Sequence, residues 1–385
     1  MMDDYYKLAE KILSELVSFN TTNKPGNEKP LAEYIASQMK RYGFQTEIQD
    51  VAENRSNVIL DLGTSNNQVI FTGHLDVVPA GDNWKSGDPF HLSKEGDRLY
   101  GRGSCDMKGG IAAMLASAIR LSQEGISGNC TLKLVFVVDE ETDGLGTKHY
   151  VRTHKPKDKS IVIIGEPTML ELNIAHRGVT RFRVKIYGKQ CHSGRPYEGL
   201  NSIYLMSRFA EKVREFDLER QSLDCGILPP PNMTITRANS GISDNSVPGV
   251  ADMVIDCRTV PGENAETLKK SILDILHSLF DDTDAKFTVD CFIDVMPGST
   301  TQDGRVATIV SNAFHNAFGE QAKITYFKGC CDMSAFTANG YDQTLLCGPG
   351  SLDQAHIIDE YIEIDQLHKA VDLYTEIFRQ AERTE

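Results

Sequence analysis

The segment VIFTGHLDVVP, from Val69 to Pro79, joins a strand pattern to charged side chains. Its β-branched residues and its phenylalanine are typical of a strand buried in a sheet, yet His74 and Asp76 stand two residues apart at its far end. Without partners, an imidazole and an ionised carboxylate are costly to bury in an apolar layer. The segment therefore predicts a buried strand whose polar end is neutralised or used by something else.

The length and composition of the chain are those of a globular protein with two or three domains. It has 385 residues, of which 40% are hydrophobic and 24% are charged. No apolar run approaches the roughly 18 residues of a membrane span. The first residues, MMDDYYKLAEKIL, are acidic and amphipathic, whereas a secretory signal needs a basic start and an apolar block. We therefore expect a soluble, cytoplasmic protein without a membrane partner.

The net charge and the cysteines narrow the class of ligand. The net charge is −14, so the long-range field repels nucleic acids and anionic membranes. The nine cysteines include no C-x-x-C pair and have no regular spacing, which argues against disulfides and against a structural zinc knot. Small molecules and metal cations are the expected ligands.

The first 176 residues alternate helix and strand patterns. Apolar residues recur at helical spacing twice, at Leu8, Ile12 and Leu16 and at Leu31, Ile35 and Met39. Continuous apolar runs then predict strands at 57–63, 68–73, 131–138 and 160–165, and small residues predict a helix from about 108 to 123. Apolar strands separated by helices are typical of a largely parallel sheet that is buried on both faces. The expected fold class is α/β.

The pattern changes near His176. TRFRVKIYG, at 180–188, alternates polar and apolar residues, as a strand with one solvated face does. A helix at 201–220, strands at 232–240 and 251–260, a helix at 263–280 and a strand at 286–294 follow, which gives the order βαββαβ. From about Val295 the α/β pattern resumes, ending in a helix from Gln366. We therefore expect a ferredoxin-like lid or dimerisation domain at 177–294, inserted into a discontinuous catalytic domain at 1–176 and 295–385.

Acidic residues and a histidine follow the strands of the predicted sheet or stand in a Gly-rich loop beside them. They are His74, Asp76, Asp106, Glu140, Glu141 and Glu166. In open α/β sheets, ligands bind beyond the carboxyl ends of the strands. Several carboxylates in one such crevice repel one another strongly unless cations are present. Metal ions are therefore the expected ligand at this edge.

The side-chain types favour zinc, and their number favours two ions. Carboxylates and imidazoles are zinc ligands, and one carboxylate more than a single ion needs suggests a pair of ions, with Asp106 sending one oxygen to each. Asp76 can accept a bond from the second nitrogen of His74. Of the adjacent Glu140 and Glu141, one serves better as a ligand and the other as a general base. Taken singly, each residue also fits a turn, a helix cap or a strand end. Their gathering at one sheet edge favours the metal site.

Seven blocks of the sequence carry a resemblance to a known family. They are GHLDVVPAGDNW, LYGRGSCDMKGG, VDEETDGLGT, GEPT, HSGRPYEGLNSI, NSVPGVADMVIDCRTVPGE and GPGSLDQAHIIDEYI. In order and spacing they resemble the co-catalytic zinc peptidases and deacylases, which include acetylornithine deacetylase, succinyl-diaminopimelate desuccinylase, aminoacylase and the glutamate-releasing carboxypeptidase. The resemblance spans nearly the whole chain.

The resemblance implies a site with two zinc ions per subunit, for which cobalt(II) is a substitute. One zinc is held by His74, Asp106 and Glu166, and the other by Asp106, Glu141 and His356, so that Asp106 is the bridge. Glu140 is then the general base, and Asp76 orients His74. On its own, the segment around His356 reads as a loop with a helix cap, and only the resemblance makes that histidine a ligand.

Three further residues are assigned by the resemblance alone. It implies that His192 reaches the partner subunit's active site in a homodimer and polarises the scissile carbonyl. It also implies that Arg258 and Asn245 contact the substrate carboxylate and the oxyanion; without it, a surface ion pair and a turn would explain them. In KGCCDMSAF, Cys330 and Cys331 stand where many relatives carry Gly-Thr or Gly-Gly. A thiolate near zinc could bind the metal or inhibit it.

The expected activity is metal-assisted hydrolysis of the amide bond of an N-acyl amino acid. The block GPGSLDQAHIIDEY most resembles that of acetylornithine deacetylases, so a deacylase similar to these enzymes or to succinyl-diaminopimelate desuccinylase is expected. Glu140 is expected to take a proton from the attacking water and return it to the leaving amine. A dipeptidase or glutamate carboxypeptidase is the alternative within the family, with a short peptide as substrate. An alternative of another class is a non-catalytic, metal-binding dimeric scaffold, against which the presence of Glu140 argues.

Overall fold

The computed structural model describes residues 2–157 and 159–384, which divide into two compact units. The first unit comprises Met1–Ile174, Ser299–Phe327 and Cys331–Glu385. The second comprises Ala175–Gly298 and Lys328–Cys330. Each unit has a hydrophobic core of its own. No helix in the described part of the chain is both long and apolar enough to cross a bilayer.

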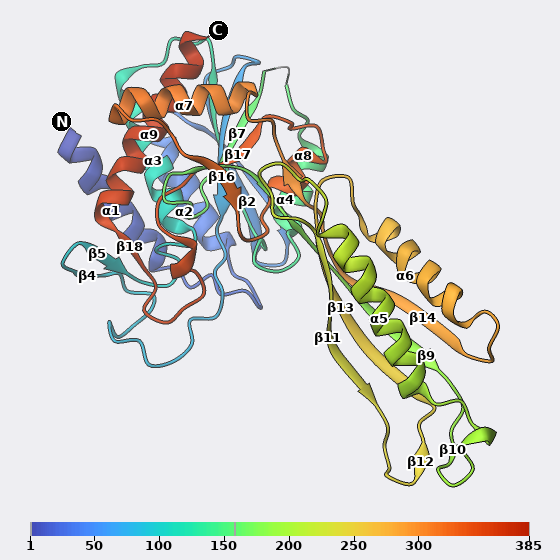
Figure 1. Ribbon diagram of the computed structural model, residues 1–385. Helices are drawn as coiled ribbons and strands as arrows, with labels where there is room; N and C mark the ends of the chain where they lie inside the picture. Colours follow the sequence, from blue (N-terminus) through green and yellow to red (C-terminus); the bar gives the residue numbers. More distant parts are fainter. Residues whose placement is uncertain (1, 158, 385) are drawn as a thin grey trace. The chain divides into compact units, whose positions relative to one another are not determined.

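A nine-stranded sheet of described residues forms the centre of the first unit (Figure 1). Its order is β1-β2-β6-β3-β7-β17-β8-β15, with β16 paired to β8. The strands are β1 (Gln45–Ala52), β2 (Arg55–Leu62), β3 (Gln68–His74), β6 (Thr131–Val137), β7 (Ile161–Ile164), β8 (Leu172–His176), β15 (Gly298–Ser299), β16 (Ile324–Phe327) and β17 (Thr344–Leu346). The central strands β6, β3, β7 and β17 run parallel, whereas β1, β2 and β8 pair antiparallel. The predicted α/β class with a mostly parallel sheet is confirmed.

Helices cover both faces of this sheet. They are α1 (Met2–Val17), α2 (Lys29–Lys40), α3 (Lys108–Glu124), α4 (Leu145–Thr153), α7 (Arg305–Phe318), α8 (Met333–Thr337) and α9 (Ile364–Arg383). Because successive side chains of a strand point to opposite faces, Val69 and Phe71 pack in the core that α1, α3 and α9 share. Ile70 instead packs in the core that contains Tyr150 of α4 and Phe336 of α8. Burial on both faces explains the continuous apolar runs of these strands.

A small antiparallel sheet in the first unit was not predicted. Its strands are β4 (Ser93–Glu95), β5 (Arg98–Tyr100) and β18 (Tyr361–Glu363), in the order β18-β5-β4. Tyr361 pairs with Tyr100, and Ile362 pairs with Leu99. The pairing brings the C-terminal segment that follows the short helix η2 (Leu352–Gln354) beside the Gly-rich loop at 101–107.

The second unit is a four-stranded antiparallel sheet with two helices. Its elements are β9 (Gly178–Tyr187), α5 (Ser202–Arg220), β11 (Asn232–Ser240), β13 (Val250–Thr259), α6 (Ala265–Phe280) and β14 (Lys286–Val295), in the sheet order β11-β13-β9-β14. Both helices lie along the sheet (Figure 1), and Phe209 and Phe280 pack against Phe182 of β9. The opposite face carries ion pairs such as Arg181 to Asp256, with the nitrogen and oxygen 2.7 Å apart. The two-residue strands β10 (Cys191–His192) and β12 (Ser246–Val247) pair beside it, near η1 (Pro196–Glu198).

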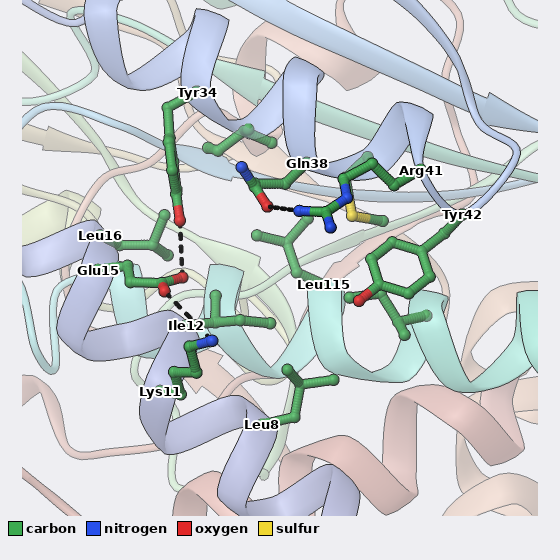
Figure 2. Close-up of a pocket in the computed structure, with 13 residues that line it drawn as sticks. Leu8, Lys11, Ile12, Glu15, Leu16, Tyr34, Gln38, Arg41, Tyr42 and Leu115 are labelled. Atoms are coloured by element: carbon green, nitrogen blue, oxygen red, sulfur yellow. Dashed lines mark hydrogen bonds and ion pairs between the residues drawn. The ribbon is translucent and has the colours of Figure 1, made fainter.

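A pocket of about 220 Å³ opens between α1, α2 and α3 in the first unit (Figure 2). Leu16, Met39 and Leu115 contribute apolar walls from the three helices. The Tyr34 hydroxyl donates a hydrogen bond to the Glu15 carboxylate at 2.7 Å. The described residues that line this pocket include none of the predicted site residues, which gather elsewhere in the unit.

Candidate metal centre

Five of the predicted ligands and bases lie at the carboxyl ends of neighbouring parallel strands or in the loop beside them. His74 is the last residue of β3, Glu140 and Glu141 follow β6, and Glu166 follows β7. Asp106 stands two residues before α3. Because β6, β3 and β7 are adjacent and parallel, their carboxyl ends meet at one edge. The sheet thus assembles side chains that are far apart in the sequence.

Close packing of α3 on β7 brings the Asp106 loop to this edge. A Cβ atom on Gly110 of α3 would lie 2.4 Å from the carbonyl oxygen of Gly165, the residue before Glu166. Any larger side chain at 110 would therefore push the helix away from the strand. Gly110 thus permits the approach that sets the Asp106 loop beside the end of β7.

Asp106 lies between two histidines. Its Oδ1 is 3.0 Å from Nε2 of His74, and its Oδ2 is 3.4 Å from Nε2 of His356. Nε2 of His356 is also 2.9 Å from Oε2 of Glu141. His356 has a φ of 63°, in the left-handed region that residues other than glycine rarely adopt, and such conformations cluster at functional sites. The two oxygens of one carboxylate thus face two separate imidazoles.

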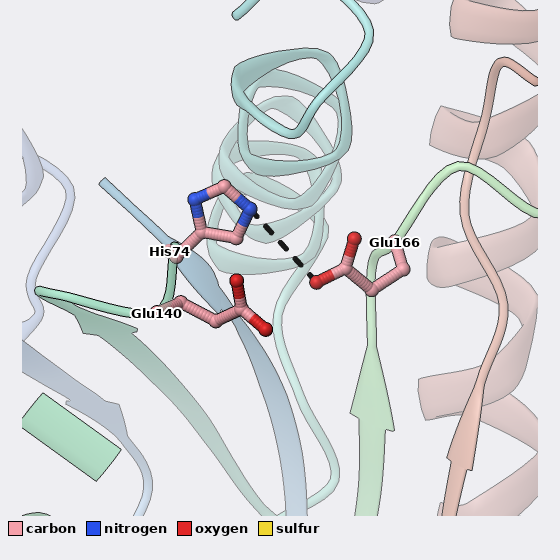
Figure 3. A group of neighbouring side chains, drawn as sticks. All are labelled: His74, Glu140 and Glu166. Carbon is pink, nitrogen blue, oxygen red and sulfur yellow. Dashed lines mark ion pairs between the residues drawn. The ribbon is translucent and has the colours of Figure 1, made fainter. Parts of the chain in front are cut away.

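Glu140 and Glu166 complete the cluster on the side of His74 (Figure 3). Oε1 of Glu166 is 3.9 Å from Nε2 of His74. One donor atom from each of His74, Glu140 and Glu166 lies within 4.8 Å of the others, and the same holds for His74, Asp106 and Glu141. The two groups share His74 and so join five side chains, and His356 adds a sixth through its contacts with Asp106 and Glu141.

Burial and mutual repulsion shift the pKa values of the cluster. Burial and the charge of Glu166 raise the pKa of Glu140 well above its usual range, and burial and the charge of Asp106 do the same for Glu166. Burial also acts to raise the pKa of Asp106, but hydrogen bonds from His356 and His74 lower it below its ordinary value. Hydrogen bonds to Asp106 and Glu141 raise the pKa of His356 to about 10. The cluster therefore carries more carboxylates than its two imidazoles neutralise.

The donor set of this cluster fits divalent cations. Four carboxylates and two imidazoles converge, and both are ligand types that zinc and similar metals take. A dication among them would remove the repulsion that raises the pKa values of Glu140 and Glu166. The shared position of Asp106 fits a ligand that serves two ions.

Asp76 contacts His74 in a different way from the one expected. Nδ1 of His74 is 2.8 Å from the main-chain oxygen of Asp76, whereas the Asp76 carboxylate is 3.8 Å away. The carboxylate instead accepts hydrogen bonds from the backbone N–H groups of Glu140 and Glu141, at 3.1 and 3.2 Å. Asp76 therefore orients the histidine with its main chain and holds the Glu140–Glu141 turn with its side chain.

Glu360, which the sequence did not suggest, holds the Asp106 loop. Its carboxylate accepts hydrogen bonds from the backbone N–H groups of Cys105 at 2.8 Å and of Asp106 at 3.0 Å, and from that of Gly103 at 3.1 Å. It also pairs with Arg102 at 2.6 Å, and both side chains are buried. The pairing of β18 with β5 places this glutamate under the loop.

The other three predicted residues lie in the second unit. His192 is exposed, and its Nδ1 accepts a hydrogen bond from the backbone N–H of Gly194 at 3.0 Å. Ser193, the next residue, donates its backbone N–H to the main-chain oxygen of Asn245 at 3.0 Å. Arg258 of β13 donates to Asp256 at 3.0 Å. His192 and Asn245 are thus neighbours at the β10–β12 pair.

The two adjacent cysteines fall in different units. Cys330 belongs to the second unit, where its thiol donates to the main-chain oxygen of Arg177 at 3.3 Å. Cys331 is buried in the first unit, and burial together with the charges of Glu166 and Glu140 raises the pKa of its thiol well above the ordinary value. Burial also raises the pKa of the Cys330 thiol, so the surroundings of both cysteines favour the thiol over a thiolate that could bind a metal.

Comparison with known proteins agrees with the fold and identifies a family. The chain is 28% identical over 396 residues, 95% of each chain, to a probable succinyl-diaminopimelate desuccinylase of Staphylococcus aureus strain N315. Its fold is similar to that of aminopeptidase PepT from Bacillus cereus, with a TM-score of 0.81, 18% identity and 98% of each chain covered. It is also similar to Bacillus subtilis YXEP, a dinuclear metal-binding peptidase, with a TM-score of 0.74, 15% identity and 98% of each chain covered. Residues 70–380 match the model of peptidase family M20/M25/M40. The chain therefore belongs to this family and is a metal-dependent hydrolase.

Proposed function

We propose that the protein is a two-zinc amidohydrolase. His74, Asp106 and Glu166 would hold one zinc, and Asp106, Glu141 and His356 the other. The observation that carries the proposal is the position of Asp106, whose two oxygens face His74 at 3.0 Å and His356 at 3.4 Å. The similarity to the B. subtilis neighbour, a dinuclear metal-binding peptidase, supports a pair of ions.

Glu140 is the proposed general base. Within residues 2–157 and 159–384 its carboxylate accepts no hydrogen bond, whereas Glu141 is held by His356. A carboxylate that accepts no hydrogen bond beside the cluster can take a proton from water and give it to the leaving amine. Bound zinc ions would supply Lewis acidity to the scissile carbonyl and lower the pKa of the attacking water. The hydrogen bond from the Glu140 N–H to Asp76 keeps the base at the edge of the cluster.

His192 is proposed to act on the scissile carbonyl of a partner subunit in a homodimer. It lies in the second unit, is exposed and is free to be presented to another molecule. The same unit exposes Tyr197, Tyr204 and Ile242, which are 82%, 70% and 87% exposed, and β11 is an edge strand. Exposed aromatic and aliphatic side chains beside an open sheet edge suit association with a second copy.

The proposed substrate is an N-acyl amino acid, with the acyl group of a desuccinylase or deacetylase substrate. The S. aureus relative supports this class. Arg258, paired with Asp256, and Asn245 are proposed to contact the substrate carboxylate and the oxyanion. A short peptide is the second candidate, which the aminopeptidase PepT neighbour favours.

Location in a reducing compartment such as the cytoplasm is part of the proposal. No disulfide joins the nine cysteines in the described part of the chain, and five of them are buried: Cys105, Cys130, Cys257, Cys331 and Cys347. Buried free thiols persist where disulfides do not form.

A substrate screen with defined metals tests the proposal. The metal-free protein is loaded with zinc or cobalt and incubated with N-succinyl-diaminopimelate, N-acetylornithine and a set of dipeptides, and the released amine is measured. We expect release from an N-acyl amino acid, and release slower by about 10² to 10⁴-fold in a matched Glu140→Gln variant. Release from dipeptides alone would establish the second candidate, and no release from any amide would contradict the proposal.

A further inference from the structure

A buried chain of charges leads from the start of α2 to the turn after β6. Glu28, Arg55 and Asp139 are 0%, 7% and 1% exposed. Nε of Arg55 donates to Oε2 of Glu28 at 2.9 Å, and its Nη1 donates to Oδ1 of Asp139. A guanidinium presents its donors in a fixed fork, so one arginine can hold two carboxylates in a defined geometry. Arg55 thereby fixes Asp139 with respect to Glu28.

Asp139 is the first residue of the turn that carries the proposed base. Its φ of 70° lies in the left-handed region, which is costly for a residue other than glycine. Its carboxylate also accepts hydrogen bonds from the Thr142 hydroxyl at 2.7 Å and the Leu145 N–H at 3.3 Å, and its main-chain oxygen accepts one from the Gly144 N–H at 2.6 Å. Glu140 follows directly. Several bonds therefore hold a strained residue next to the base.

Asn23 joins this chain to the carboxylate beneath the turn. Its side-chain nitrogen is 2.9 Å from Oδ2 of Asp76 and 3.1 Å from Oδ1 of Asp139. The Asp76 carboxylate accepts the backbone N–H groups of Glu140 and Glu141. The start of the turn and its two glutamate N–H groups thus depend on one network.

Stability alone does not account for this network. Replacement of a buried ion pair by apolar residues is often neutral or stabilising, so such a pair is weak evidence of a stabilising role. Strained backbone persists where its surroundings over-determine it, and it clusters at functional sites. Gly26 leaves room for the pair, because a Cβ atom there would lie 2.4 Å from Nε of Arg55.

We infer that Arg55 and Asn23 are positioning residues for catalysis, which fix the Asp139–Glu141 turn so that Glu140 and Glu141 meet the metal cluster. This inference rests on the proposed roles of these glutamates as base and ligand. Neither Arg55 nor Asn23 is a proposed ligand, and both act through Asp139 and Asp76.

Arg55→Met and Asn23→Ala test the inference in the full-length protein. Zinc is titrated into each metal-free variant by calorimetry, and kcat and KM are measured for the zinc-loaded variants. Loss of groups that orient metal ligands lowers metal affinity by about 10 to 100-fold. We expect the affinity for one of the two zinc ions to fall by this factor. We also expect kcat to fall by about 10 to 100-fold, while KM stays within about threefold of the wild-type value. Arg55→Lys keeps the positive charge but lacks the forked donors of the guanidinium. It should therefore restore only part of the zinc affinity and part of kcat.

Arg220→Met is the matched control. Arg220 is buried in the second unit, and its Nη2 donates to both carboxylate oxygens of the partly buried Glu263, at 2.7 and 2.8 Å. A purely structural role for Arg55 predicts that its variant behaves like this control, with a lower melting temperature but unchanged zinc affinity and kcat, and that result would overturn the inference. If Arg55→Met does not fold, Asn23→Ala decides by the same measurements. Failure of the proposed function would appear instead in the wild-type protein, as absent amide hydrolysis with the zinc titrations unaffected.

Discussion

The substitution Glu140→Gln should distinguish the role of general base from the role of metal ligand. Glu140→Gln keeps the shape of the side chain, and its backbone N–H still reaches Asp76. The variant should therefore retain its metal. General acid–base catalysis contributes about 10² to 10⁴-fold, so kcat should fall by that factor, which is about 2.7 to 5.5 kcal/mol of transition-state stabilisation. KM should change little, because the lost group acts in the transition state.

The same substitution should stabilise the metal-free protein. Burial and the charge of Glu166 raise the pKa of Glu140, so the folded state binds a proton more tightly than the unfolded state. Such a group favours folding fully below its ordinary pKa of about 4.3 and loses that contribution as the pH rises toward its folded value. At neutral pH an uncharged glutamine removes the penalty. Metal-free Glu140→Gln should melt above the metal-free wild type, with a gap that narrows as the pH falls.

Metal analysis, steady-state kinetics and melting curves of the metal-free proteins check this prediction. Glu141→Gln is the matched control, because its carboxylate contacts His356 and it should lose metal. If Glu140→Gln instead lacks a metal equivalent, Glu140 is a ligand and the division of roles is wrong. A kcat within tenfold of the wild type, or a lower melting temperature of the metal-free variant, would also refute the reasoning.

Three further outcomes are expected. In calorimetry, Asp106→Asn should lower the affinity for both zinc ions, whereas His356→Ala should lower mainly the affinity for one. Equal losses in the two variants would rule out the bridging role of Asp106. Mixed dimers of His192→Ala and Glu140→Ala chains, refolded together and identified by a tag on one chain, should recover about a quarter of wild-type activity, since about half the dimers are mixed and each has one complete site. No recovery would mean that the histidine serves its own subunit or has no catalytic role. Glu360→Gln removes the negative charge that pairs with a buried guanidinium and should destabilise the fold by about 3 to 5 kcal/mol in denaturant unfolding, whereas an unchanged midpoint would show that this pair is dispensable.

The strand-end part of the cluster could be predicted from local patterns and one rule of topology. His74, Glu140 and Glu166 follow apolar strands, and parallel strands bring their carboxyl ends together. The period of two correctly placed Asp76 beside His74. The pattern of alternation does not show which oxygen of Asp76 accepts the bond from His74. That choice depends on the turn at Glu140, which follows β6, about 60 residues further along the chain.

The residues that hold the ligand loops could not be predicted in this way. His356 and Glu360 take their positions from the pairing of β18 with β5, two three-residue strands too short to show a periodic pattern. Arg55 reads as an ordinary turn residue at the start of β2, and its two partners, Glu28 and Asp139, come from two separate segments. The one available signal is a glutamate inside the apolar stretch IIDEYI, because an acidic group among such neighbours needs a partner.

The place of β17 in the sheet has a consequence for the protein while it is being made. β17 lies between β7 and β8, but it is synthesised about 170 residues after β8, behind the whole second unit. At a synthesis rate of about 5 to 20 residues per second, the ribosome needs about ten to thirty seconds to reach it. During that interval β7 presents an open edge to other nascent chains, which is a route to aggregation. The growing polypeptide is therefore expected to depend on chaperones until about nine tenths of it has been made, and products that stop before residue 344 are expected to be insoluble.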